Sequence, residues 1–68
     1  SARVVISTAN TSNTTFTFNA GIGQTLKTDG NAAWTSTALE VTNTQTMIVD
    51  VFRTDGVTYY LTHVGTYS

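Results

Sequence analysis

Apolar and polar residues alternate in short segments along the whole chain, and each segment is bounded by Gly, Asn, Asp or Ser. No segment keeps apolar residues at the i, i+3, i+4, i+7 spacing of an amphipathic helix over three turns. A period of two residues is typical of strands. The pattern predicts strands at residues 3–7, 14–19, 24–28, 32–35, 38–42, 46–54 and 57–64. We therefore expect an all-β fold with a single domain over residues 1–68, a small antiparallel, hairpin-rich β-sandwich or barrel-like module.

The dipeptide Asp55-Gly56 joins the last two predicted strands. It favours a two-residue type I′ turn, because both turn positions need positive φ. Counting outward from this turn pairs Phe52 with Tyr59. The same Thr-Asp-Gly order occurs at residues 28–30, where we expect a second hairpin. Both motifs lack the ligand spacing of an EF-hand loop, so a turn explains them better than ion binding does.

The predicted register gives the last hairpin two apolar faces. Side chains alternate across a strand, so one face carries Met47, Val49, Val51, Tyr60 and Val64, and the other carries Ile48, Asp50, Phe52, Tyr59, Leu61 and His63. A hairpin that is apolar on both faces needs cover on both, and a chain of 68 residues supplies little of it. We therefore expect a homo-oligomer, intertwined or packed, with an interface formed by Met47, Val49, Val51 and Tyr60 and with its register fixed by Asp50.

The composition narrows the classes of partner and cofactor. Charged residues make up 10% of the chain and the net charge is −1, whereas about 25% of an ordinary domain is charged. The Lys and Arg residues number 3, too few to follow a phosphate backbone, so we expect no nucleic-acid binding. The absence of Cys and the single His argue against a disulfide or a Cys/His metal site. We expect no metal or cofactor. The sequence has no run of about 20 apolar residues, so we expect no membrane insertion.

Asp50 is the most unusual ionisable residue, because it lies within the apolar run 47–52. The predicted register places it diagonally opposite His63, at about 7–8 Å between backbones. An Asp/His pair is compatible with hydrolase chemistry, but a triad also needs a nucleophile and an oxyanion site, and the many Ser and Thr residues single none out. A structural pair, or an Asp satisfied by the backbone or a symmetry mate, is the simpler interpretation. We expect no enzymatic activity and no catalytic residue.

A second group of residues is compatible with binding a cell-surface glycan. Aromatic faces beside amide and carboxylate groups suit carbohydrate recognition, and Trp is rarely fully buried. The residues that would contact the glycan are Trp34, Asp29, Asn31 and Asp55. The alternative interpretation is that the aromatic residues fill the core or an interface.

The segments NTTFTFNAGIGQTL and VDVFRTDGVTYY resemble the repeat-like β domains of tailed-bacteriophage fibres, tail tips and related virion proteins. In that family a T-x-F-T-F strand, a Gly loop, a Trp region and a V-D-V-F…D-G…T-x-Y-Y hairpin follow in this order. This sequence has a short segment between Thr28 and Leu39 and lacks the family's proline and multiple glycines around the Trp. The resemblance implies a virion module, commonly a homotrimer, that serves particle assembly, capsid decoration or host attachment with other virion proteins and uses no cofactor. A lectin-like carbohydrate-binding module is the alternative function.

Overall fold

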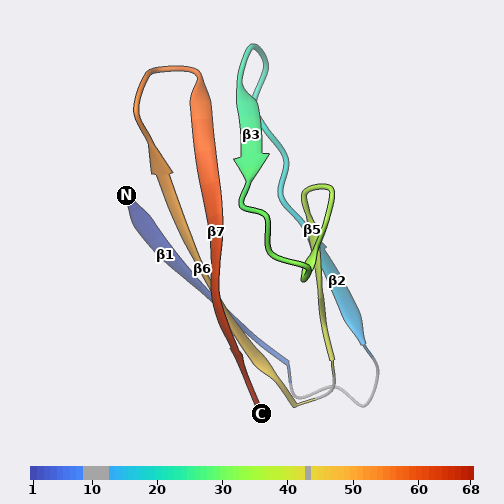
Figure 1. Cartoon of the computed structure of the whole chain (residues 1–68). Helices are drawn as coiled ribbons and strands as arrows, with labels where there is room; N and C mark the ends of the chain where they lie inside the picture. Colours follow the sequence, from blue (N-terminus) through green and yellow to red (C-terminus); the bar gives the residue numbers. More distant parts are fainter. Residues whose placement is uncertain (9–12, 43) are drawn as a thin grey trace.

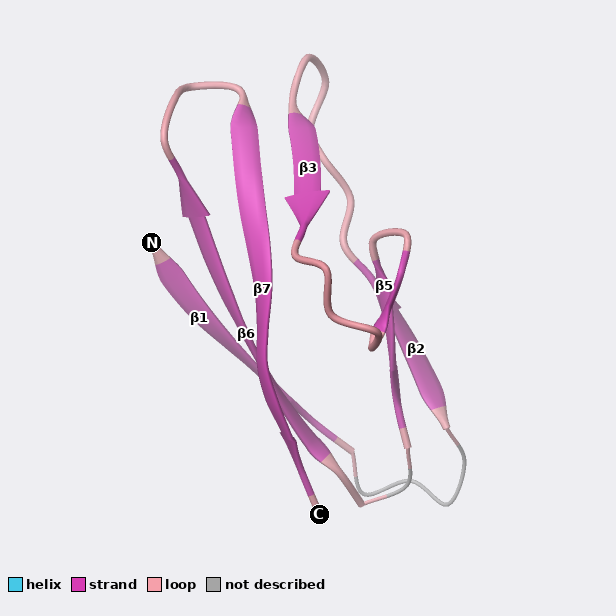
Figure 2. Cartoon of the chain, viewed as in Figure 1, coloured by secondary structure: helices cyan, strands magenta, loops and turns pink. Residues whose placement is uncertain are grey.

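The computed structural model of the 68-residue chain describes residues 1–8, 13–42 and 44–68. The described part contains strands and no helix (Figure 2), which confirms the predicted all-β fold. The strands are β1 (Ala2–Ser7), β2 (Thr14–Thr17), β3 (Thr25–Thr28), β4 (Trp34–Thr35), β5 (Ala38–Val41), β6 (Thr46–Arg53) and β7 (Thr58–Tyr67). Each matches a predicted strand, with ends that differ by a few residues. The loop predicted between the first two strands falls largely on residues 9–12, outside the described residues.

The strands form two sheets that pack as a sandwich (Figure 1). The four-stranded sheet has the order β1-β6-β7-β3, and the three-stranded sheet has the order β2-β5-β4. Strand β3 pairs with β7 in parallel, and the other described pairs are antiparallel. The predicted small sandwich is therefore present, but the expectation that all its strands pair antiparallel is wrong for β3.

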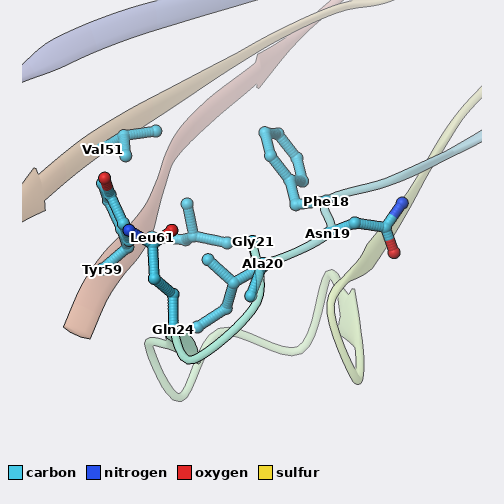
Figure 3. A pocket seen from close by; sticks show the side chains of 9 residues that line it. Phe18, Asn19, Ala20, Gly21, Gln24, Val51, Tyr59 and Leu61 are labelled. Carbon is cyan, nitrogen blue, oxygen red and sulfur yellow. The ribbon is translucent and has the colours of Figure 1, made fainter. Parts of the chain in front are cut away.

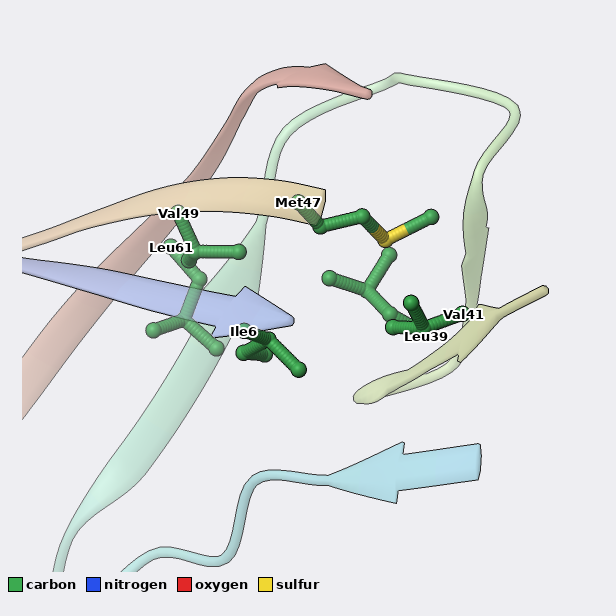
Figure 4. Close-up of a cluster of buried hydrophobic side chains, with 6 residues drawn as sticks. All are labelled: Ile6, Leu39, Val41, Met47, Val49 and Leu61. Carbon is green, nitrogen blue, oxygen red and sulfur yellow. The ribbon is translucent and has the colours of Figure 1, made fainter. Parts of the chain in front are cut away.

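The core lies between the two sheets and is small. Strands β1, β6 and β7 direct buried side chains toward buried side chains of β5 (Figure 4). The buried residues are Ile6, Leu39, Val41, Met47, Val49 and Leu61. Partly buried side chains such as Phe16 and Phe18 extend this cluster toward the sandwich edge. Few side chains are fully removed from water, as expected for a domain of this length.

The two sheets differ in length, and this difference makes the molecule elongated. Strands β6 and β7 have 8 and 10 residues, whereas β2 and β5 have 4 each. The molecule measures 38 × 19 × 19 Å, and its radius of gyration is 12.3 Å. A compact domain of this length is expected to have a radius of gyration of about 11 Å. The long hairpin therefore extends beyond the sheet that covers it.

The predicted turn between β6 and β7 is wrong, and with it the predicted register. Phe52 pairs with Tyr60, one residue further along than predicted, and Arg53 pairs with Tyr59. Among the described residues, only Ser36, Thr44 and Gly23 have positive φ. Asp55 and Gly56 do not, so this dipeptide does not form a type I′ turn. Instead the Asp55 carboxylate accepts hydrogen bonds from the backbone N–H groups of Val57 and Thr58, at 2.8 and 2.7 Å. This local capping stabilises a longer loop.

The Thr-Asp-Gly sequence at residues 28–30 is not the tip of a hairpin. It lies where the chain leaves β3 in one sheet and crosses to β4 in the other. The backbone N–H of Asp29 donates to the carbonyl of Leu61 at 3.0 Å, and this bond continues the parallel pairing of β3 with β7. A hairpin would have required the next strand to pair with β3 in the same sheet.

Candidate functional site

The four-stranded sheet has one side that the second sheet does not cover, and we call it the outward face. Residues paired across a sheet share a face, and neighbours along a strand alternate. The pairings therefore define the members of the outward face as Arg3, Val5, Ser7, Thr25, Lys27, Thr46, Ile48, Asp50, Phe52, Thr58, Tyr60, Thr62, Gly65 and Tyr67. Nothing in the described part of the chain packs on this face as a second layer (Figure 1).

Large apolar and aromatic side chains lie among the Thr, Ser and charged residues of the outward face. Phe52 and Tyr60 lie side by side on neighbouring strands, with ring centroids 5.3 Å apart and an angle of 17° between the ring planes. Val5 on the edge strand is 59% exposed, and Tyr67 near the C-terminus is 55% exposed. An apolar surface of this kind on a sheet is typical of an interaction site.

The charges at the centre of the outward face neutralise each other. Arg3 donates from Nε to Oδ1 of Asp50 at 2.7 Å and from Nη2 to Oδ2 at 3.0 Å. These two hydrogen bonds lower the pKa of Asp50 below its ordinary value and raise the pKa of Arg3. The two residues are direct cross-strand partners in the pairing of β1 with β6. Asp50 therefore helps to fix the pairing register of β1 and β6 within the chain. The sequence predicted a different role, in which Asp50 fixes the register between subunits.

The residues predicted to form a subunit interface do not share one face. Met47 and Val49 are 5% and 0% exposed and belong to the core between the sheets, with Val51 packed against them. Tyr60 lies on the opposite side, because the pairing is shifted by one residue from the predicted register. The chain itself covers Met47 and Val49, so the surface left for a partner is the outward face. Val5 and Tyr67 were not predicted at this surface, because only the pairing of β1 and of the end of β7 with β6 places them there.

The predicted pair of Asp50 and His63 does not form. His63 pairs with Val49, whose side chain points to the core, whereas Asp50 belongs to the outward face and pairs with Thr62. Nε2 of His63 lies 2.8 Å from the hydroxyl of Thr66. The one-residue shift in register places the two side chains on opposite sides of the sheet. Hydrolase chemistry based on these two residues is therefore contradicted by the geometry.

The residues predicted to contact a glycan are not gathered into one site. Asp29, Asn31 and Trp34 lie along the crossing from β3 to β4, whereas Asp55 lies at the tip of the last hairpin. The carboxylate of Asp29 accepts from the backbone N–H of Asn31 at 3.0 Å and from that of His63 at 2.9 Å. The side-chain oxygen of Asn31 accepts from the N–H of Ala33 at 2.8 Å. These polar groups already stabilise the fold of the crossing.

Trp34 packs at the edge of the core. Its ring meets that of Phe18 edge to face, with centroids 5.9 Å apart and planes at 65°. Its Nε1 is buried and has no hydrogen-bond acceptor among the described residues. A buried N–H donor without an acceptor is unfavourable. Trp34 is partly buried and contributes to the packing at the edge of the core, and its contact with a glycan stays a prediction.

An open cavity of about 210 Å³ lies between the segment after β2 and the uncovered end of the four-stranded sheet (Figure 3). Phe18, Val51 and Leu61 supply its apolar lining, and Asn19, Gln24 and Tyr59 supply polar groups. The cavity is smaller than the ~300–1,000 Å³ of typical small-molecule sites. Among the described residues no three His, Cys, Asp or Glu side chains are placed to hold a metal ion. The same part of the chain has no helix that could cross a membrane.

No family model, curated protein or solved structure matches this chain. The functional interpretation therefore depends on the fold, on the outward face and on the sequence resemblance described above.

Proposed function

We propose that the chain is a non-enzymatic structural module of a bacteriophage virion, in a tail fibre, a tail tip or a capsid decoration. In this role it assembles as a homo-oligomer by burying the outward face against further copies of itself. The observation that carries the proposal is a sheet face without a second layer in the described part of the chain, on which Val5, Phe52 and Tyr67 are exposed and the charges of Arg3 and Asp50 are paired. The resemblance to virion β domains supports the setting in a virion and favours three copies, and it adds a role in host attachment beside other virion proteins.

The size of the outward face supports a protein partner. Four strands spaced by about 4.8 Å give a width of about 19 Å, and 8 residues of β6 give a length of about 26 Å. Each copy therefore offers a flat area of about 500 Å², and two copies together bury about 1,000 Å². This sum lies near the lower limit for a specific interface between proteins.

The charges on the outward face support a second copy as the occupant. Arg3 and Asp50 satisfy each other, so stacking two such faces leaves neither charge without a partner. Lys27 lies on the edge strand β3, away from the centre of the face. A strongly charged partner would find no complementary field in the centre and would bury its own charges unpaired.

Light scattering after size exclusion, repeated on dilution, tests the proposal. We expect the wild type to have the mass of an oligomer and Phe52→Lys to have a lower mass than the wild type at the same concentration, because a lysine in the interface would be buried without a counter-ion. Val57→Lys is the matched control, since Val57 is similarly exposed but lies in the loop of the last hairpin. A wild type that is monomeric at every concentration would overturn the proposal.

A further inference from the structure

Strand β1 is an edge strand with little protection against pairing. It ends the order β1-β6-β7-β3, and one side of its backbone has no neighbouring strand in the described part of the chain. Its six residues include no Pro and one charged residue, Arg3. Natural sheets usually block such edges with charge, Pro or a bulge. Here the guanidinium of Arg3 is held by Asp50 of the neighbouring strand, so the charge is directed back over its own sheet.

An apolar groove runs beside the same edge. It lies between β1, the edge of the four-stranded sheet, and β2, the edge of the three-stranded sheet. Its volume is about 410 Å³, and Val4, Ile6, Phe16 and Phe18 form the apolar part of its wall. In the described part of the chain, the side of the sandwich is therefore open where the edges of β1 and β2 meet a strip of apolar side chains.

We propose that β1 pairs antiparallel with β1 of a second copy about a two-fold axis, which closes both grooves in one contact. The pairing joins two four-stranded sheets into one continuous sheet and brings Phe16 and Phe18 of each copy toward the other copy. It extends the proposed assembly role, but it uses an edge of the sandwich and not the outward face. Addition of a strand to an exposed sheet edge is a recurrent mode of recognition.

The faces of β1 limit the possible registers. Val4 and Ile6 face the core side, whereas Arg3, Val5 and Ser7 face outward. In one register, Val5 lies opposite Val5 of the second copy, and Val4 lies opposite Ile6. The core-facing residues of both copies are then on the same side of the joined sheet. Arg3 lies opposite Ser7 in this register, so no like charges are opposed.

The lining of the groove and its size favour a second copy as the occupant. If a strand with several charges bound beside the apolar groove, its charges would be buried without counter-ions. Strand β1 of a second copy avoids this cost, because its one charged residue, Arg3, is already paired with Asp50. The six residues of β1 span about 20 Å, and the sandwich is 19 Å wide. Each copy therefore contributes a side of about 400 Å², and the total of about 800 Å² corresponds to a weak, concentration-dependent contact.

A single introduced cysteine tests the edge pairing, because the natural chain contains none. In the proposed register the two Val5 Cα atoms lie about 4.5–5.5 Å apart, within the range of about 4.4–6.8 Å that a disulfide spans. Stacked sheets are about 10 Å apart, so two outward faces packed together do not allow the same bridge. Val57→Cys is the matched control, with a similar exposure in the loop of the last hairpin.

We expect mild oxidation to link Val5→Cys into a folded dimer about ten-fold or more faster than Val57→Cys, because pairing raises the effective thiol concentration. Circular dichroism and the mass after reduction verify that the linked protein keeps its fold. Equal rates for the two variants overturn the edge pairing. If light scattering still shows an oligomer in that case, the proposed function stands without it. A monomeric wild type whose Val5→Cys variant links selectively supports the edge pairing and overturns assembly through the outward face.

Discussion

The carboxylate of Asp29 holds together parts of the chain that are far apart in sequence. One oxygen accepts the N–H of Asn31 in the crossing, and the other accepts the N–H of His63 in β7, 34 residues away. Asp55 caps the N–H groups of Val57 and Thr58 near the start of the same strand. These hydrogen bonds lower the pKa of Asp55 below its ordinary value. The two Thr-Asp-Gly motifs are therefore two anchors for β7, which explains their similarity without a ligand.

Replacing Asp29 with Ala should lower the free energy of unfolding by about 1–3 kcal/mol, because two backbone N–H groups lose their acceptor. Asp29→Asn keeps one side-chain carbonyl oxygen, and we expect an intermediate loss. Urea denaturation followed by circular dichroism measures both changes. Glu40→Ala is the control, since Glu40 is exposed on β5 and surface changes of this kind usually stay within about 0.5 kcal/mol. Equal effects of Asp29→Ala and Glu40→Ala would contradict the anchoring role.

At the scale of the elements, the alternating pattern predicted the strands because alternation is a local property of the sequence. The pairing of strands is not local. The last hairpin differs from the prediction by one residue, and that shift moves His63 to the core side and Tyr60 to the outward face. In the observed loop the Asp55 carboxylate caps two backbone N–H groups. An Asp-Gly dipeptide is compatible with this capping and with a type I′ turn, so the dipeptide alone does not fix the register. The parallel pairing of β3 with β7 likewise depends on contacts far apart in sequence.

Two glycine substitutions test the observed turn. Gly56 does not have positive φ, and a Cβ at this position would meet no atom within 4 Å. We expect Gly56→Ala to raise the free energy of unfolding by about 0.4–1 kcal/mol, because Ala restricts the unfolded chain. Gly23 has a φ of 76° and equally open surroundings, so Gly23→Ala should lower stability by about 1–2 kcal/mol. A loss for Gly56→Ala as large as that for Gly23→Ala would support the type I′ turn instead.

At the scale of the whole molecule, the long hairpin supplies apolar side chains both to the core and to the outward face. The chain covers one side of its long hairpin with the short second sheet and leaves Phe52 and Tyr60 on the other side. The alternating pattern predicted a hairpin that is apolar on both faces. The predicted interface fell mainly on the covered side, because the pattern does not tell which face the rest of the chain packs against.

Assembly through the outward face makes stability depend on protein concentration. Association of the folded state shifts the unfolding equilibrium by mass action. For a domain of this size we expect the wild-type melting temperature to rise by roughly 3–5 °C for each tenfold increase in concentration. The melting temperature of Phe52→Lys should depend less on concentration than that of the wild type, whereas Val57→Lys should keep the wild-type dependence. Scanning calorimetry over two decades of protein concentration measures the three melting temperatures. A wild-type melting temperature that does not change with concentration would mean that the chain is stable with its outward face in water.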